Sequence, residues 1–246
     1  VTAGEDAIII NMVDPETAAQ CIEAAGDVPV VFVNRFPGAP SVLNEKAVYV
    51  GSDEMTSGAF QGEFLAKFFK DQGKTDISYL MLNGILGQTS TTNRTASVLK
   101  ALEDNGIKAT AAAAPLAADY DRATAMDMIS PLLKTTKYDC IISNNDAMAL
   151  GAVEAMQQQG LDPKSVPIVG IDATADGRQA IKDGTLAMTV FQNAEGQGRA
   201  SLQAAANLID GKPIAEGTGY EVDDENEFII WVPFEPVTID NVADYD

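Results

Sequence analysis

The sequence predicts an α/β protein built from doubly wound parallel sheets, and three observations support this prediction. Short apolar runs alternate with amphipathic stretches along the chain. Most of these runs are continuously apolar, which is typical of parallel strands covered on both faces. The chain has 246 residues, enough for one or two domains with sizeable cores. A strand–helix–strand order of this kind calls for doubly wound sheets.

The expected strands and helices follow from these patterns. The predicted strands are residues 7–12, 29–33, 47–50, 77–82, 138–143, 166–170, 186–191 and 228–234, with a weaker one at 107–112. The predicted helices are residues 15–26, 53–71, 91–105, 121–135, 146–160, 174–184 and 195–210.

Residue types at the helix ends agree with these boundaries. Asp14, which precedes a proline, is the expected N-cap of the first helix, and Asp121 and Asp146 are plausible N-caps of later helices. Gly106 and Gly160 follow the ends of two helices, where a left-handed residue is expected. The start and stop signals therefore support a βαβα order.

Composition and charge exclude several classes of function. Lys and Arg total 16 against 36 Asp and Glu, so the net charge is −20, which opposes binding to nucleic acid or to an anionic membrane. The chain has no histidine, which excludes a Ser-His-Asp triad, a Cys-His pair and imidazole metal sites. No apolar run reaches the roughly 18 residues of a membrane span.

The two cysteines do not form a disulfide framework. Cys21 falls in an expected helix and Cys140 in an expected apolar strand, so we predict both to be reduced and largely buried. Asp223, Asp224 and Glu225 are interpreted as a solvated turn rather than a cation site. The chain has no phosphate-binding GxxxxGK[ST] loop.

Polar side chains follow most of the predicted strands. In open α/β sheets ligands bind beyond the carboxyl ends of the strands, and these residues are Asn11, Asn34, Arg35, Asn83, Asn144, Asn145, Asp146, Asp172, Gln192 and Asn193. Such groups suit a neutral hydroxylated ligand, because each sugar hydroxyl both donates and accepts. Tyr120 and Phe36 offer rings for the apolar face of a pyranose. The alternative is that these residues cap helices and finish turns.

Six segments together resemble a known family. They are AIIINMVDP (7–15), PVVFVNRFP (29–37), YVGSD (49–53), SNNDAMALGAVEA (143–155), PIVGIDA (167–173) and AMTV followed by Gln192. In this order they resemble the periplasmic sugar-binding proteins of bacterial ABC transporters, of the ribose/galactose-binding type, closest to its glucose/galactose-binding branch.

The resemblance implies two Rossmann-like doubly wound lobes joined by three hinge strands, with a sugar closed between them. The expected N-lobe is residues 1–51 plus 193–231, and the expected C-lobe is 52–192 plus 232–246. The family has a further strand, helix, strand and helix before the 7–12 strand, roughly 55–65 residues. We therefore expect an incomplete N-lobe in which residues 7–12 leave one row of backbone groups unpaired.

The resemblance also implies the sugar-binding residues, and it implies no cofactor. They are Asn34, Arg35, Gln88, Ser90, Arg94, Tyr120 or its neighbour Asp121, Asn145, Asp172 and Gln192. Gln88, Ser90, Tyr120 and Gln192 depart from the histidine, aspartate, tryptophan and asparagine usual at these positions, which leaves the identity of the hexose open. Residues 71–76 stand where the galactose binders have a calcium loop, but they lack its alternating oxygen ligands, so no calcium is predicted there.

The implied function is capture of a monosaccharide, a glucose- or galactose-like hexose, and its delivery to an ABC transporter permease without any bond being made. The implied location is periplasmic, or extracellular as a membrane-anchored lipoprotein, and a chemoreceptor is a further partner that stays open. One alternative is the effector-binding core of a lactose-repressor-type transcription regulator, which shares the fold. Another is an enzyme on a doubly wound fold.

Overall fold

The computed structural model describes residues 4–245. The chain forms two compact units: unit 1 is Val1–Asp53 with Asn193–Pro233, and unit 2 is Glu54–Gln192 with Phe234–Asp246. The chain therefore passes from one unit to the other three times. The expected lobe boundaries lie two residues earlier at the first and third of these crossings and coincide at the second.

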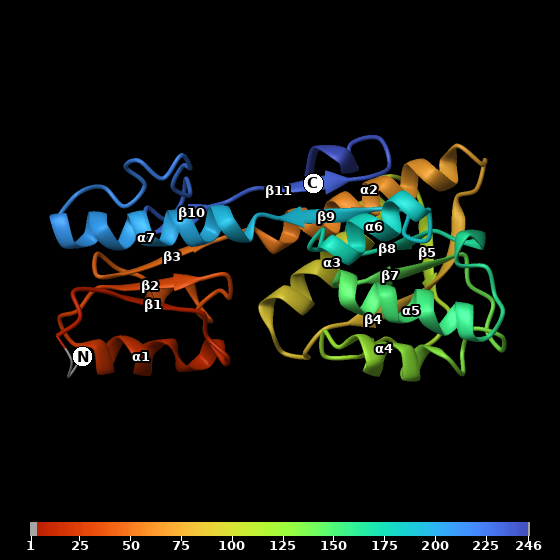
Figure 1. Ribbon diagram of the computed structural model, residues 1–246, viewed down its shortest axis with the longest axis horizontal. Helices are drawn as coiled ribbons and strands as arrows, with labels where there is room; N and C mark the ends of the chain where they lie inside the picture. The colour runs from red at the N-terminus through yellow and green to blue at the C-terminus, as the bar shows by residue number, and fades with distance from the viewer. Residues whose placement is uncertain (1–3, 246) are drawn as a thin grey trace. The chain divides into compact units, whose positions relative to one another are not determined.

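Unit 1 contains a parallel sheet with a helix on each face (Figure 1). Its strand order is β1 (Ile8–Ile10), β2 (Val30–Val33), β3 (Ala47–Gly51) and β10 (Ile229–Trp231). The helices are α1 (Ala18–Ala25) and α7 (Ala194–Asp210). Alternate β2 residues point to opposite faces, so Phe32 packs toward α1 and Val31 toward α7.

Strand β1 is the edge of this sheet. Among the described strands it pairs with β2 alone, with Ile8 opposite Val30 and Ile10 opposite Phe32. Ile9 is 39% exposed, although its run is continuously apolar. Within residues 4–245 no strand pairs with the other side of β1, as the resemblance led us to expect.

Unit 2 is a second α/β/α sandwich. Its main parallel strands lie in the order β5 (Lys108–Ala111), β4 (Asp76–Asn83), β7 (Cys140–Ser143) and β8 (Ile168–Val169), with β6 (Leu116–Ala117) also pairing with β4. Two isolated parallel bridges lie beside these strands: Val169 of β8 pairs with Met188, and Asp172 pairs with Phe191 of β9 (Thr189–Gln192). Strand β9 also pairs antiparallel with β11 (Phe234–Val237).

The helices of unit 2 bury two separate apolar layers against this sheet. The helices are α2 (Glu54–Lys70), α3 (Thr89–Asp104), α4 (Arg122–Ile129), α5 (Asp146–Gln158) and α6 (Ala175–Asp183). Leu65 of α2 and Val98 of α3 pack in one layer. Ile129 of α4, Met148 of α5 and Ile181 of α6 pack in the other.

The order in which parallel strands are added to the sheet of unit 2 switches sides between β4 and β7. From β4 the chain adds β5 on one side, and it then returns to add β7 and β8 on the other. Such a switch point opens a crevice at the carboxyl ends of the two central strands. Asn83 ends β4, and Asn144 and Asn145 follow β7, so these polar residues lie at that edge.

Three sequence predictions need correction. The 228–234 strand is two strands, β10 in unit 1 and antiparallel β11 in unit 2, because the chain crosses at Val232 and Pro233 and proline lacks an N–H. Helix α4 ends at Ile129 rather than residue 135, since Pro131 disfavours helix just before it. The N-cap of α5 is Asn145, not Asp146, which is the first helical residue and fully buried.

The other cap predictions are confirmed, except that Asp14 caps a 3-10 turn and Thr17 is the N-cap of α1. The Asp121 carboxylate accepts a hydrogen bond from the Thr124 N–H at 2.7 Å and caps α4. Asp14 accepts from the Glu16 N–H at the start of a 3-10 turn that leads into α1. Gly106 and Gly160 have φ values of 71° and 69°, the left-handed conformation expected after α3 and α5.

Candidate functional site

The centre of the candidate site is Arg94, on the second turn of α3 in unit 2. Its guanidinium is buried and makes two bonds to the Glu54 carboxylate, from Nε at 2.6 Å and from Nη2 at 3.1 Å. Nη1 donates to the Asn144 carbonyl at 2.7 Å. A guanidinium has five N–H donors, so one donor on Nη1 and one on Nη2 have no hydrogen-bond acceptor within the described part of the chain.

Asp172 faces this arginine from the turn after β8. Its Oδ1 lies 3.9 Å from Nη1 of Arg94, and its side chain keeps a quarter of its surface exposed. A separation of 3.9 Å is too long for a direct hydrogen bond. One ligand oxygen between the two groups can instead accept from Arg94 and donate to Asp172. The resemblance implied both Arg94 and Asp172 as sugar contacts, and the structure brings the two side chains together.

The charges at this site perturb one another. Burial by itself would lower the pKa of Arg94, but the carboxylates of Glu54 and Asp172 outweigh burial and raise it, so the guanidinium stays charged. Burial raises the pKa of Asp172 to about 7, the nearby Arg94 charge opposes that rise, and the charges of Asp146 and Glu54 add to it. Asp172 therefore changes its charge near neutral pH.

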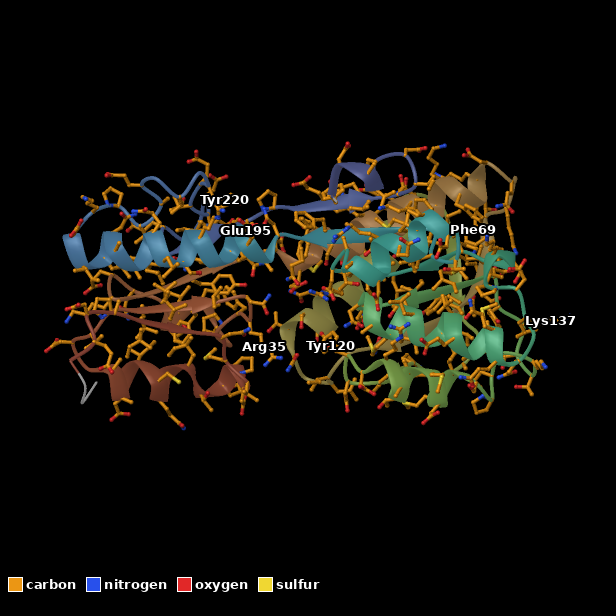
Figure 2. All side chains as sticks on the ribbon, viewed as in Figure 1. Arg35, Phe69, Tyr120, Lys137, Glu195 and Tyr220 are labelled. Atoms are coloured by element: carbon orange, nitrogen blue, oxygen red, sulfur yellow. The ribbon has the colours of Figure 1, made fainter. Side chains whose placement is uncertain are left out.

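Tyr120 lies beside the first turn of α3 (Figure 2). Its hydroxyl is 2.8 Å from the hydroxyls of both Ser90 and Thr91. A Cβ at Gly84 would come within 2.0 Å of the Tyr120 ring, so the ring packs directly on the backbone that follows β4. Two predicted sugar contacts, Ser90 and Tyr120, are thus fixed to each other. Asp121, the neighbour of Tyr120 in the sequence, caps α4.

Three further predicted residues lie around the same edge of unit 2. Asn145 caps α5 through its Oδ1, which accepts from the Met148 N–H at 3.0 Å. Its amide nitrogen has no hydrogen-bond partner among residues 4–245. Gln88 precedes α3 and makes no side-chain cap bond. Gln192 ends β9, and its backbone N–H donates to the Asp172 carbonyl at 3.3 Å.

Unit 1 holds the remaining two predicted residues at the end of β2. Asn34 has a φ of 67°, its carbonyl accepts from the Tyr49 hydroxyl at 2.6 Å, and its amide donates to Gln197 Oε1 at 3.3 Å. Arg35 donates from Nη1 to the Met12 carbonyl at 2.8 Å, and its side chain lies at the strand end (Figure 2). These contacts fix both side chains within their own unit.

Sequence reasoning missed Glu54 and Thr91, and it missed the role of Asn144. Glu54 reads as an ordinary acidic residue in the first turn of a helix, and no spacing connects it to an arginine on another helix. Asn144 was noted as a strand-end residue, but its carbonyl, not its side chain, binds Arg94. A backbone contact leaves no signal in the residue type.

Other kinds of site have no counterpart in the described residues. Within residues 4–245, no group of three or more Cys, Asp or Glu side chains is placed to hold a metal ion. No helix in the same range has the length and apolar character to cross a bilayer. Cys140 is buried and Cys21 half-buried, and both are free thiols in different units.

The chain matches known binding proteins over its whole length. It is 36% identical over 260 residues to the D-galactose/methyl-galactoside binding periplasmic protein of Haemophilus influenzae, covering 100% of this chain and 76% of that one. It is 27% identical over 214 residues to the ribose import binding protein of Salmonella typhimurium, covering 86% and 68%.

Solved structures share the fold. One is an ABC transporter solute binding protein from Bacillus halodurans with bound myo-inositol, at a TM-score of 0.80 and 29% identity over 99% of this chain and 78% of that one. The family model described as periplasmic binding protein domain matches residues 1–213. The chain therefore belongs to the periplasmic binding protein domain family, with the type I α/β fold of that family.

Proposed function

We propose that this chain binds a monosaccharide or a cyclic polyol and delivers it to the membrane permease of an ABC transporter. The observation that carries the proposal is the pair formed by Arg94 and Asp172, 3.9 Å apart at the switch point of unit 2. The pair offers spare donors and a carboxylate acceptor to one hydroxyl. A sugar hydroxyl both donates and accepts, so it satisfies both partners at once.

The proposed ligand contacts are the nine residues that the sequence resemblance indicated. In unit 2 they are Gln88, Ser90, Arg94, Tyr120, Asn145, Asp172 and Gln192, and in unit 1 Asn34 and Arg35. The relatives support the class of ligand, since their names state galactose, ribose and myo-inositol. A hexose of the glucose or galactose type is the first candidate, because the galactose-binding relative is more similar than the ribose-binding one.

A direct test is a thermal-shift screen of the chain against D-galactose, D-glucose, D-ribose, D-allose and myo-inositol. A ligand present at 100 times its dissociation constant adds about 2.7 kcal/mol of stability, which raises the melting temperature by several degrees. Calorimetric titration then gives the affinity of each hit. No shift with any of these ligands at millimolar concentration would contradict the proposal.

The cellular role has separate tests. We propose a location outside the cytoplasm, with a lipid anchor, and no chemical conversion of the ligand. Fractionation of cells that make the full-length protein, followed by detergent phase partition, tests location and anchor. Recovery of the sugar unchanged after incubation tests the absence of turnover. A chemoreceptor is a second proposed partner, tested by sugar-dependent crosslinking in the same cells.

A further inference from the structure

Asp146 is a buried carboxylate that the proposed ligand contacts do not include. It is the first residue of α5 and has no exposed surface. Its Oδ1 accepts from the Thr189 hydroxyl at 2.6 Å. Its Oδ2 accepts from the Thr174 N–H at 2.9 Å and from the Thr174 hydroxyl at 3.3 Å. Both oxygens of this carboxylate are therefore used in connecting α5 to β9 and to the segment before α6.

On two sides the Asp146 carboxylate packs against glycines, where a side-chain carbon would not fit. A Cβ at Gly170 would lie 2.3 Å from Oδ1 of Asp146, and a Cβ at Gly177 would lie 2.1 Å from Oδ2. Any side chain at either position would displace the carboxylate. Because glycine has no side chain, Gly170 after β8 and Gly177 in the first turn of α6 leave free the space that the Asp146 carboxylate fills.

The segment that Asp146 holds has an unusual backbone. Asp172 has a φ of 117° and Ala173 a φ of 50°, both in the region that residues with a Cβ rarely adopt. The Ala173 N–H donates to the Thr189 hydroxyl at 3.2 Å, and the Ala173 carbonyl accepts from Arg178 Nη1 at 2.6 Å. Such a conformation persists only where the surroundings fix it.

We propose that Asp146 is a positioning residue for ligand binding. By bonding Thr174 and Thr189, it fixes the positive-φ residues Asp172 and Ala173 in the turn that directs the Asp172 carboxylate toward Arg94. This inference rests on the proposed function, since its effect is read through Asp172. It assigns a role to a buried side chain that touches no ligand.

The first test uses two variants. One removes the charge of the Asp146 carboxylate, and the other removes the hydroxyl of its partner Thr189. In Asp146→Asn one oxygen becomes an amide nitrogen, which cannot accept from its former donor. Thr189→Val removes the hydroxyl that connects Asp146 to Ala173, and Thr189→Ser restores that hydroxyl. We expect binding of D-galactose, or of myo-inositol if that is the better ligand, to weaken at least about tenfold in Asp146→Asn and Thr189→Val. Thr189→Ser should bind like the wild type.

Asp139 provides the matched control. It lies next to the amino end of β7, whereas Asp146 follows the carboxyl end of the same strand. Its Oδ2 accepts from the Ser78 N–H at 2.7 Å and from the Ser78 hydroxyl at 3.0 Å, and it also pairs with Lys74. Asp139→Asn should lower the melting temperature without changing the dissociation constant of the folded fraction.

A second test uses the glycines and is independent of charge. Alanine normally favours a helix over glycine by about 1 kcal/mol. In α6, Gly177→Ala places a methyl group against Asp146, and we expect it to weaken ligand binding about tenfold or more. Gly198→Ala, in α7 of unit 1 with open space around its Cβ position, is the control and should leave binding unchanged.

Hydrogen exchange separates this inference from the proposed function. In the wild type the Thr174 amide should be protected, and in Asp146→Asn it should exchange faster, whether or not a sugar binds. If the wild-type chain binds no sugar, the proposed function fails. If the Thr174 amide then also exchanges at the same rate in Asp146→Asn as in the wild type, the inference that Asp146 fixes this turn fails as well. If the wild type binds a sugar, dissociation constants within about twofold of wild type in Asp146→Asn, Thr189→Val and Gly177→Ala overturn the inference.

Discussion

The two units place polar side chains at the ends of their strands by different means. In unit 2 the groups are charged and buried, with Arg94 bonded to Glu54 and facing Asp172. In unit 1 Asn34 is a neutral amide held by Gln197 and Tyr49, and the charged Arg35 is only half-buried and donates to the Met12 carbonyl. The sheets differ as well. Among the described strands, successive strands of unit 1 are added on the same side of the sheet, whereas those of unit 2 are added first on one side of β4 and then on the other.

This difference has an energetic consequence. Hydrogen bonds to charged groups contribute about 1.5–3 kcal/mol and those between neutral groups about 0.5–1.5 kcal/mol. Unit 2 should therefore provide most of the ligand-binding energy, and its stability should depend on keeping its charges paired. Unit 1 should contribute less, and its strand-end residues should tolerate substitution better.

The largest effect is expected from Glu54→Ala. This change leaves the buried Arg94 charge without its bidentate partner, and breaking a buried ion pair in this way costs about 3–5 kcal/mol of stability. Hydrogen exchange measured by mass spectrometry should show the loss of protection in unit 2. Glu195→Ala, which breaks an exposed pair with Arg199 in unit 1, is the control, with an expected change of at most about 1 kcal/mol. Equal losses in the two variants would refute the contrast.

Asp172→Ala should have the next largest effect, on affinity. We expect a loss of about 1.5–3 kcal/mol, because the ligand loses a hydrogen bond to a charged group. Calorimetric titration with the sugar found in the screen measures the loss. Asp176→Ala, an exposed carboxylate paired with Arg122 on the same unit, should bind normally. An unchanged affinity in Asp172→Ala would remove Asp172 from the site.

The sequence predicted the elements of unit 2 better than the contacts among them. Continuous apolar runs indicated the parallel strands, and polar strand ends indicated Asn145 and Asp172 as residues to inspect. It assigned the N-cap of α5 to Asp146, whereas Asn145 is the cap and Asp146 is buried beneath the Asp172 turn. Adjacent polar residues look alike in a sequence, and only the fold decides which one points into the core.

The apolar pattern did not show that the 228–234 run is two strands, although the resemblance placed the lobe boundary inside it, between residues 231 and 232. Both halves are apolar, so the run predicts a single strand. The change from parallel β10 to antiparallel β11 depends on which strand each half meets, β3 or β9. Long-range pairing of this kind has no local signal. The proline at 233 was the one residue that marked the break.

A smaller effect is expected from pH, and it should come from unit 2 alone. The ionised Asp172 is the better acceptor, and its pKa is raised to about 7. Affinity should therefore rise with pH through neutrality and weaken about tenfold, or about 1.4 kcal/mol, one unit below that pKa. Titrations between pH 5.5 and pH 8.5 measure the dependence.

The control for this pH effect is Asp172→Asn, whose binding should be weaker and should lose the dependence on pH between 7 and 8.5; burial raises the pKa of Asp146 to about 6, so that group titrates below this range. Stability should move in the opposite direction. The folded state holds the Asp172 proton more tightly than the unfolded state, so this group's contribution to stability falls as pH rises from about 3.8 to about 7. A flat affinity profile in the wild type would show that the ligand does not need the ionised carboxylate.

The smallest effect is expected at Asn34 in unit 1. Its φ of 67° is left-handed, so Asn34→Gly removes the amide without straining the backbone, whereas alanine would add strain. The amide is neutral, and its bond to Gln197 is long at 3.3 Å. We expect a loss of affinity of about 0.5–1.5 kcal/mol and little change in melting temperature. A loss as large as that of Asp172→Ala, measured by the same titration, would show that unit 1 binds the ligand as strongly as unit 2 and would break the contrast between them.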